Sequence, residues 1–574
     1  MRKRRVNILI TVAIIFIISI SASNATLFVK NDGFSPTYYS EPWQGFTLFA
    51  PEYSTMTYLM DINKNIVHTW ESEYIQGLAA YLLEDGSLIR SCLPYANPTF
   101  MCGGITGRVE IISWAGEQIW EFEYSSDQVC MHHDLEVLPN GNVLMIAWEY
   151  KTYSQAVQAG RNPSNIPFSK FFPDKIIEVK PTGPTSGDIV WEWHAWDHLI
   201  QDFDSSKNNY GVVGDHPELI DINNFYGAPD WMHSNSVDYN EEFDQIMLSV
   251  HNFNELWIID HSTTTFEAKG HTGGNSGKGG DLLYRWGNPA AYHAGSLNDQ
   301  KLFGQHDAQW IKEGFPGEGS ILVFNNGWNR PDGQYSTVDE FIPPVDNNGF
   351  YHKDADTAYG PLEQLWIYAD EDPTDFFAGG ISGASRLPNG NTLICHGPNG
   401  YFFEVTNEKD IIWDYTNPYP TYLLNAVFKI QRYSPGYSGL SNLILGPEKP
   451  NKPKGPTSNL EIGIEYFYSS STTDPQEDQI FYLFDWGDGT DSGWLGPHNT
   501  GDIAEASHIW TKKLIYDIRV KAKDVYGYES TWSNPLRITL PIIRDSNSHS
   551  IFIDKIIKMI TAELPIFKIL FNLK

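Results

Sequence analysis

Positively charged residues are scarce in this chain. Its 574 residues include 39 Lys and Arg against 71 Asp and Glu, which gives a formal net charge of -32. Nucleic-acid binding requires a basic surface that neutralises phosphates, so this balance argues against a nucleic-acid partner. The simplest interpretation is a solvated acidic exterior. An anionic substrate would then require a local positive pocket inside a negative molecule.

Cysteine is also scarce. The chain has only four, at Cys92, Cys102, Cys130 and Cys395. There is no Cys-x-x-Cys pair, so the sequence supports neither a zinc ribbon nor a dithiol redox motif. In an oxidising compartment, the spacing favours a disulfide between Cys92 and Cys102, although the sequence does not fix the connectivity.

Long apolar runs are confined to the two ends of the chain. Residues 1–25 combine four basic residues, an apolar run over 6–20 and a stretch of small residues, which predicts a cleaved signal peptide. The alternative is an uncleaved membrane anchor. Either interpretation predicts a secreted or cell-surface protein. The tail, 542–574, is apolar but broken by charges and Pro565, so we expect an amphipathic segment that contacts a membrane surface or a protein.

Aromatic and turn-forming residues are abundant. Aromatics make up 14% of the chain, with 48 Gly and 34 Pro, a mixture typical of an all-β protein built from short strands. A strand that ends in a Gly-containing turn recurs along the chain, as in Leu135–Asn142. These opening strands begin near Leu78, His133, His233, His306, Ser382 and Ala426.

Strands that end in tryptophan alternate with these opening strands. They contain Trp70, Trp120, Trp191 with Trp193, Trp286, Trp366 and Trp413. Six openings and six closings predict a six-bladed β-propeller over residues 26–445. The first closing strand precedes the first opening strand, so we expect N-terminal strands to complete the last blade and close the ring. Two stacked β-sandwiches are the alternative.

The composition changes after the predicted propeller. Residues 446–456 form a Pro/Lys-rich linker, and 457–541 form a small unit of short strands. That unit contains Trp486-Gly487-Asp488-Gly489 and resembles the PKD-like immunoglobulin-type modules of extracellular proteins. We interpret its aspartates, Asp485, Asp488 and Asp491, as turn caps rather than as a calcium loop.

Three of the predicted opening strands begin with histidine. In a propeller these strands line the central channel, so His133, His233 and His306 should project into one funnel, with Ser382 in the same slot of another blade. Such a cluster could hold a metal ion, or it could bind and attack a small anionic group without metal. The neighbouring Asn235 and His251 favour the second chemistry.

Strand alternation adds two expectations. Asn235 should lie on the same strand face as His233, two residues earlier. Asp134 and Asp307 each follow a histidine directly, so both should point to the opposite face and serve blade packing.

Several of these motifs together resemble a known family. They are His132-His133-Asp134 with Leu138-Pro139-Asn140-Gly141-Asn142, Asp230–Tyr239, Ser249-Val250-His251, Gly304-Gln305-His306-Asp307 and Arg386–Thr392. They look like the bacterial arylsulfate sulfotransferases, which are six-bladed propellers that move a sulfuryl group between phenols without a nucleotide donor. The resemblance implies an aryl sulfate and a phenol as substrates, with no cofactor and no metal.

The resemblance also assigns roles to individual residues. His306 matches a nucleophile that forms a transient sulfohistidine, and His133 and His233 match histidines that bind the sulfuryl oxygens and assist proton transfer. Asn235 matches an oxygen-binding amide, and Ser382 falls near a hydroxyl position of the family site.

One position departs from the family pattern. His251 stands where the family has arginine, and histidine carries charge only when its surroundings or the pH allow it. Arg285 and Arg330 are candidates to compensate. Two other functions stay open on the residues alone: a non-catalytic extracellular binding or adhesion propeller, and a histidine-ligated metalloenzyme.

Overall fold

The structure is a computed structural model that describes residues 41–225, 227–355, 357–443, 446–525, 527–540 and 555. The predicted signal peptide and all but one residue of the predicted tail lie outside these residues. Within the described part of the chain, no helix is both long enough and apolar enough to cross a membrane.

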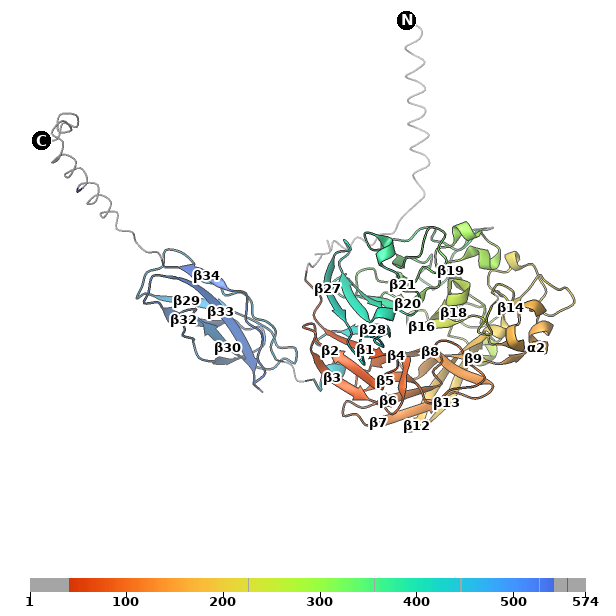
Figure 1. Ribbon diagram of the computed structural model, residues 1–574, viewed down its shortest axis with the longest axis horizontal. Coiled ribbons are helices and arrows are strands. Elements are labelled where there is room, and N and C mark those ends of the chain that lie inside the picture. The colour runs from red at the N-terminus through yellow and green to blue at the C-terminus, as the bar shows by residue number, and fades with distance from the viewer. Residues whose placement is uncertain are drawn as a thin grey trace, which may run out of the picture.

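Six four-stranded antiparallel sheets form the main body, which confirms the predicted all-β propeller (Figure 1). Blade 1 contains β4 (Ile75–Leu82), β5 (Leu88–Leu93), β6 (Arg108–Ile112) and β7 (Gln118–Glu123). Blade 2 contains β8 (Val129–Val137), β9 (Val143–Glu149), β12 (Asp174–Gly183) and β13 (Ser186–His194). Blade 3 contains β16 (Ser234–Asn240), β17 (Gln245–Val250), β18 (Glu255–Asp260) and β19 (Tyr284–Trp286).

The remaining blades follow the same order. Blade 4 contains β20 (His306–Trp310), β21 (Ile321–Asn325), β22 (Thr337–Phe341) and β23 (Trp366–Tyr368). Blade 5 contains β24 (Gly383–Arg386), β25 (Thr392–His396), β26 (Tyr401–Val405) and β27 (Ile411–Thr416). Blade 6 contains β28 (Val427–Tyr433), β1 (Phe46–Pro51), β2 (Met56–Met60) and β3 (Ile66–Glu71).

The N-terminal strands close the ring, as predicted. β1 pairs antiparallel with β28, with Phe46 opposite Tyr433, so residues almost 400 positions apart share one sheet. This pairing gives β28, the inner strand of blade 6, a neighbour in its own sheet and so completes the last blade. The insertions between strands carry the helices α2 (Tyr153–Gln158) and α3 (Thr265–Ala268) and two short pairs: β10 (Lys151–Thr152) with β11 (Lys170–Phe171), and β14 (Leu199–Ile200) with β15 (Ile220–Asp221).

The tryptophans of the closing strands join each blade to the next. Their indole N–H groups donate to the following blade or to the chain attached to it. These bonds run from Trp120 to the Ser186 carbonyl, Trp191 to the Thr263 hydroxyl, Trp286 to the Pro361 carbonyl, Trp366 to the Asn407 carbonyl and Trp413 to the Ile62 carbonyl. Trp70 of blade 6 instead packs edge-on against Trp114 of blade 1. The recurring tryptophan therefore marks a contact between blades.

The inner strands do not keep strict alternation at the histidines. His133, His233 and Asp307 have φ values of 53°, 54° and 51°, and the strand pairing shifts register beside each of them. Each irregularity is a bulge that turns the following side chain. The expectation that Asp134 and Asp307 point away from the channel was therefore wrong.

Asp134 and Asp307 instead meet one lysine from the opposite side of the ring. Lys429 of β28 contacts Asp134 at 2.8 Å and Asp307 at 3.2 Å, and all three side chains are almost fully buried. Tyr81 of β4 donates to Asp134 at 2.9 Å. The inner strands of blades 1, 2, 4 and 6 are thus joined across the channel.

A cavity of about 1000 Å³ lies beyond this ion cluster, further along the same inner strands. Its lining includes Glu136, Gln309 and Gln431, each two residues past a member of the ion cluster, and Asp238, five residues past His233. The inner strands of blades 2 and 4 therefore run from a histidine, past an aspartate of the ion cluster, to the cavity.

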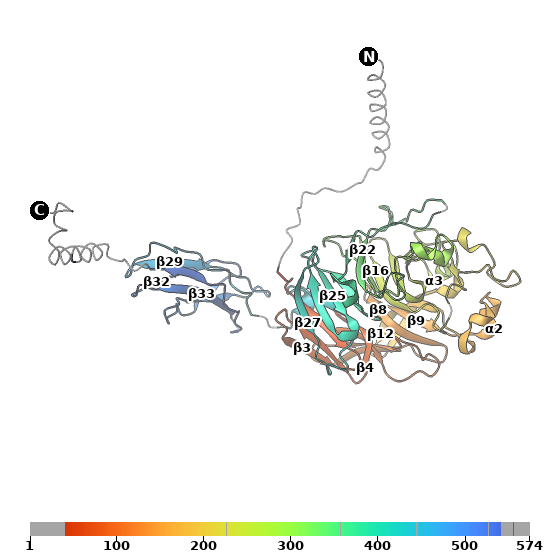
Figure 2. The same ribbon diagram turned by 45° about the horizontal axis from the view of Figure 1, so that its top comes forward.

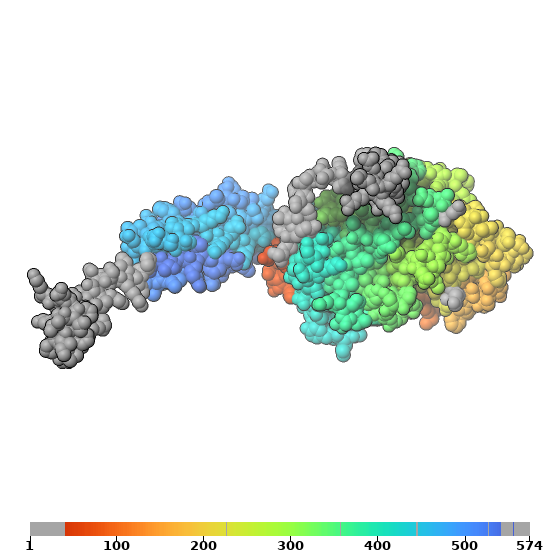
Figure 3. Space-filling view, turned by 90° about the horizontal axis from the view of Figure 1, so that it is seen from above, coloured from red at the N-terminus to blue at the C-terminus, as the bar shows by residue number. Residues whose placement is uncertain are grey.

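The C-terminal unit packs two sheets over one core (Figure 2). One sheet pairs β29 (Glu465–Ser470) with β32 (Ala504–Ile509), and the other orders β31 (Leu495–His498), β30 (Ile480–Asp485), β33 (Ile515–Asp524) and β34 (Leu536–Thr539). In the space-filling view this unit lies at one side of the propeller (Figure 3). The predicted linker runs along the unit, with Asn451 and Lys454 donating their backbone N–H to Ser471 and Ser469.

The predicted turn caps of this unit are confirmed. Asp485, Asp488 and Asp491 each accept a backbone N–H from two residues ahead, at 2.8 to 3.0 Å. The expected disulfide does not form, and all four cysteines are free. Cys92 lies inside blade 1 on β5, whereas Cys102 packs with the group around Phe100 and Trp148.

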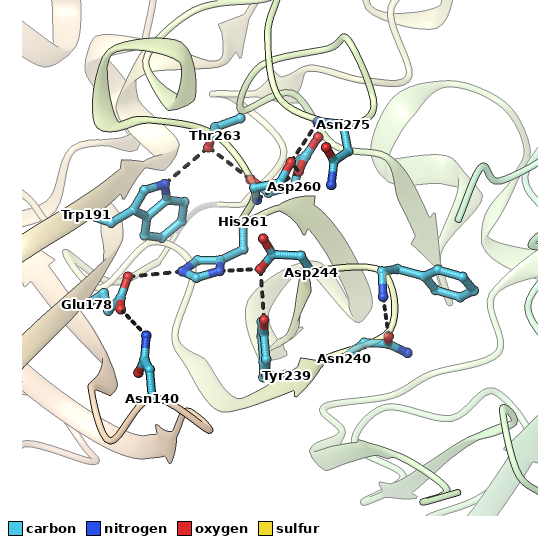
Figure 4. Close-up of polar contacts among 12 residues, drawn as sticks. Asn140, Glu178, Trp191, Tyr239, Asn240, Asp244, Asp260, His261, Thr263 and Asn275 are labelled. Atoms are coloured by element: carbon cyan, nitrogen blue, oxygen red, sulfur yellow. Dashed lines mark hydrogen bonds and ion pairs between the residues drawn. The ribbon is translucent and has the colours of Figure 1, made fainter. Parts of the chain in front are cut away.

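A charged histidine joins blades 2 and 3 at the ends of their strands (Figure 4). His261 lies 2.6 Å from Asp244 and 3.3 Å from Glu178, which belong to blades 3 and 2 respectively. Burial alone would lower the pKa of His261, but its hydrogen bonds to the two carboxylates outweigh burial and raise the pKa to about 9.

We predict that His261→Gln lowers the free energy of unfolding by about 2–3 kcal/mol at about pH 6. The folded pKa lies above the unfolded value, so this contribution is complete below the unfolded pKa of about 6.5 and is lost as the pH rises through about 9. Urea denaturation at about pH 6 and about pH 10 measures the difference. His352→Gln, at an exposed position, is the control, and an equal loss at both pH values contradicts the assignment.

Candidate functional site

Four imidazoles form a row at the mouth of the channel. Ring centroids are 4.5 Å apart between His133 and His233, 5.1 Å between His233 and His251, and 5.3 Å between His251 and His306. Phe428 of β28 lies 6.1 Å from both His133 and His306, so it faces the two ends of the row. The structure therefore brings together the three histidines predicted as catalytic and places His251, predicted to bind substrate, between two of them.

Gly104 covers His133. The His133 backbone N–H donates to the Gly104 carbonyl at 2.8 Å, and a Cβ on Gly104 would lie only 1.9 Å from the imidazole. Gly104 also has a φ of +79°, so both space and backbone favour glycine here. His133 and His306 are almost fully buried, while the His233 side chain is 21% exposed. Solvent therefore reaches the row at His233.

Asn326 fixes the protonation state of His306. The Asn326 amide donates both its hydrogens, to the carbonyls of Ala378 and Ile381, so its oxygen must face His306. That oxygen lies 2.8 Å from Nδ1 of His306 and can only accept a hydrogen bond. Nδ1 therefore carries the proton, and Nε2 of the neutral ring carries a lone pair. Burial, together with the neighbouring His251, holds the pKa of His306 well below its usual value.

His233 has the opposite charge preference. Its Nδ1 lies 2.5 Å from Asp230, whose other oxygen accepts the Trp148 indole N–H at 2.9 Å. Burial works to lower the pKa of His233, but the Asp230 carboxylate outweighs burial and raises the pKa above its usual value. His233 is therefore the one imidazole of the row that favours a positive charge.

His133 is held by its neighbour in the sequence. Nδ1 of His133 lies 2.8 Å from Nδ1 of His132, and Nε2 of His132 lies 3.4 Å from Asp174. His132 also stacks on Trp148. Burial and the surrounding histidines hold the pKa of His133 well below its usual value, so this ring is neutral.

His251 is neutral as well. The Asn252 amide donates to the backbone carbonyls of Asp230 and Trp231, which leaves its oxygen 2.9 Å from Nδ1 of His251. Burial and the nearby charge of His233 lower the pKa of His251 to about 4. Near neutral pH, His251 is therefore uncharged, although it stands where the resembled family has an arginine.

Two predicted ligands are already engaged in local contacts. Asn235 lies directly at the bulge and donates to the Gln305 carbonyl at 2.7 Å, so it positions the residue before His306. The Ser382 hydroxyl donates to Gly380 and accepts the Gly397 N–H, both in blade 5.

The two arginines do not compensate for His251. Arg285 is buried in an ion pair with Glu255. Arg330 donates to the Tyr335 carbonyl and the Thr337 hydroxyl. Both guanidinium groups are therefore occupied by partners within blade 3 and blade 4.

Sequence reasoning missed the residues that set the charge of each imidazole, namely Asp230, Asn326, His132 and Asp174. A signal was available for Asp230, three residues before His233, and for His132, directly before His133, because both lie within the motifs noted in the sequence. Asn326 lies 20 residues after His306, at the end of β21, with no repeat to mark it.

The row combines three neutral buried imidazoles, His306 among them, with one favoured cation, His233. Within the described residues, two groups of side chains have donor atoms close enough for a metal ion, and neither includes the channel histidines. A row that contains both neutral imidazoles and a cationic donor is suited to nucleophilic and acid–base chemistry on an anionic group.

The C-terminal unit is similar to the PKD domain of a peptidase from a Thermoplasmatales archaeon, with 45% identity over 17% of this chain and 97% of that one, at a TM-score of 0.16. A protein of unknown function from Bacteroides caccae matches with 10% identity over 68% of this chain and 98% of its own, at a TM-score of 0.36.

AztD from Citrobacter koseri matches with 6% identity over 69% of this chain and 100% of its own, at a TM-score of 0.28. No curated relative matches this chain. The arylsulfotransferase (ASST) family model matches residues 43–434, which cover the propeller and all four histidines of the row. Because this match spans more than half of the sequence, the chain belongs to the arylsulfotransferase family.

Proposed function

We propose that the protein transfers a sulfuryl group from a phenolic sulfate ester to a phenolic acceptor through a sulfohistidine at His306. The observation that carries this proposal is the fixed tautomer of His306. Asn326 holds the proton on Nδ1, so Nε2 is unprotonated without any base having to act first. The depressed pKa of His306 keeps that nitrogen available well into the acidic range.

In the first half-reaction, the Nε2 lone pair of His306 attacks the sulfur of the aryl sulfate. The N–S bond forms as the S–O bond to the aryl group breaks, and His233 protonates the leaving phenolate. Positive charge develops on the His306 ring in this step. The hydrogen bond from Nδ1–H to Asn326 strengthens as it does, so Asn326 favours the transition state over the ground state.

In the second half-reaction, a phenol acceptor takes the place of the product. His233, now neutral, removes its proton, and the phenolate oxygen attacks sulfur as the N–S bond breaks. The lone pair returns to Nε2 of His306, and the proton is again on His233. The enzyme therefore ends each cycle in its starting state, which gives ping-pong kinetics.

Charged imidazoles of the histidine row bind the sulfuryl oxygens in this mechanism. His233 supplies a cation, and an anion bound beside the neutral His133 and His251 raises their pKa values toward protonation. Hydrogen bonds from charged donors to the sulfuryl oxygens are about twice as strong as neutral ones. No nucleotide takes part in this scheme, which suits the extracytoplasmic location that we also propose from the N-terminal segment.

We also propose that the C-terminal unit is a PKD-like module, on the basis of its two-sheet core and its aspartate-capped turn. A propeller that only binds at a cell surface is the second candidate function, favoured by that module. Incubation with 4-nitrophenyl sulfate and phenol separates the two functions, because only the transferase releases nitrophenolate.

We predict that His306→Ala lowers transfer from 4-nitrophenyl sulfate by about 10⁴-fold or more, because the nucleophile is lost. Asn326→Leu should lower kcat by about 100-fold, since the Nδ1 proton loses its acceptor. Mass spectrometry of the protein after donor alone should show one added sulfuryl group on the His306 peptide. His352→Ala is the control, and unchanged transfer by His306→Ala overturns the assignment.

We predict a bell-shaped pH profile of kcat/KM with an alkaline limb that belongs to His233. Its raised pKa keeps the acid form present above about pH 6.5, and activity falls as the pH passes the folded pKa. Asp230→Asn should move that limb down by about one pH unit, because the stabilising carboxylate is gone. The pH dependence of kcat/KM measures it, and a profile that Asp230→Asn leaves in place contradicts the role of His233.

We predict that His251→Arg lowers KM for the aryl sulfate by about tenfold at about pH 8, because a guanidinium keeps its charge there. The gain should shrink in acid, where the anion already draws a proton to His251. KM at several pH values tests this, with His251→Gln as the uncharged control. A folded arginine variant with weaker donor binding shows that His251 does not contact the sulfuryl group.

A further inference from the structure

A second cluster of titratable side chains lies away from the channel, between the outer parts of blades 2 and 3. It joins His198, in the insertion after β13, to His271 and Asp281, at the two ends of a glycine-rich loop that follows α3. Nδ1 of His198 and Nδ1 of His271 each lie 2.8 Å from the same oxygen of Asp281. The three donor atoms lie within 4.8 Å of one another.

A backbone carbonyl fixes the tautomer of His198. Its Nε2 lies 2.8 Å from the Ala268 oxygen, which can only accept, so Nε2 carries a proton. In a neutral ring, Nδ1 of His198 then carries a lone pair that faces a carboxylate oxygen. Two lone pairs at this distance repel unless a cation lies between them or the ring takes a second proton. His198 has no exposed surface, so its ring contacts only protein groups.

The surroundings match those of metal-bound histidines. A histidine that binds a metal almost always donates its other N–H to a carbonyl or carboxylate, and Ala268 supplies that acceptor here. Gly280 lets the loop approach this ring, because a Cβ there would lie 2.7 Å from Nε2 of His198. The Gly280 carbonyl in turn accepts the Trp193 indole N–H at 2.7 Å, which fastens the loop to blade 2.

We infer that His198, His271 and Asp281 bind a divalent transition-metal ion of the zinc class. Two imidazoles and one carboxylate are a common ligand set for Zn²⁺. Bonds of about 2.1 Å in a tetrahedral site separate the ligands by about 3.4 Å, so the two rings open by about 0.6 Å to admit the ion. The His271 side chain is 61% exposed, so the fourth position faces water.

The metal joins two insertions that already contact each other in the folded protein. His198 belongs to the insertion between β13 and β16, and His271 and Asp281 belong to the insertion between β18 and β19. A backbone hydrogen bond from Leu282 to Glu218, of 3.0 Å, lies beside the site. The ion therefore cross-links the outer edges of blades 2 and 3, and its binding stabilises the folded protein.

The test uses full-length protein purified without a histidine tag and stripped of metal with EDTA. Calorimetric titration with ZnCl₂ at about pH 7.5 should give one site per chain, and the melting temperature should rise by a few degrees with Zn²⁺. Substitution with Co²⁺ should give the visible absorption of a four-coordinate site. His271→Ala, at an exposed position, should weaken Zn²⁺ binding by at least about 100-fold and abolish the melting shift.

His216→Ala is the matched control, because that histidine is also exposed and pairs with a carboxylate, Glu218, on the same insertion. It should keep the Zn²⁺ affinity and the melting shift of the wild type. Asp281→Asn tests the third ligand independently. The inference is overturned if the wild type binds no stoichiometric Zn²⁺, or if His271→Ala and Asp281→Asn bind it as tightly as the wild type does.

Discussion

The ion cluster of Lys429, Asp134 and Asp307 holds the channel in the shape on which the site depends. Asp134 and Asp307 directly follow His133 and His306, so fixing these carboxylates fixes the two ends of the imidazole row. Losing one partner of such a buried pair leaves an uncompensated charge at a cost of about 3–5 kcal/mol. Burial works to lower the pKa of Lys429, but the two carboxylates outweigh it and raise the pKa, which keeps the lysine charged. The cluster also lies between the histidines and the cavity at the far end of the channel.

The histidines differ in function because their neighbours differ. All four rings are largely buried, and burial alone would make each neutral. Only His233 has a carboxylate in direct contact, and only His233 has a raised pKa. His251 and His306 face amide oxygens, which fix Nδ1 as the donor without supplying charge. Four residues of one type thus differ in charge and tautomer because their hydrogen-bond partners differ.

The repeated strand pattern could be recognised in the sequence because packing between the blades requires it. A tryptophan recurs in each closing strand because its indole packs on, and in five blades donates to, the next unit. Histidines at equivalent strand starts likewise had to converge once the strands formed a ring.

The bulges at His133, His233 and Asp307 could not be predicted from the sequence, because positive φ at a non-glycine residue has no sequence signal here. That omission led to the wrong direction for Asp134 and Asp307. Lys429, Asn326 and Asp174 come from other strands and loops, so only the folded chain brings them to the row.

Replacing arginine by His251 changes how the site acquires its positive charge. A permanent guanidinium would place a second cation near His233 in the empty site and lower the pKa of His233 through like-charge repulsion. With a neutral His251, Asp230 and His233 form a balanced pair before substrate arrives. In the mechanism that we propose, the anionic donor then supplies the charge that draws a proton to His251. That mechanism links donor affinity to pH, whereas an arginine would keep its charge throughout the physiological range.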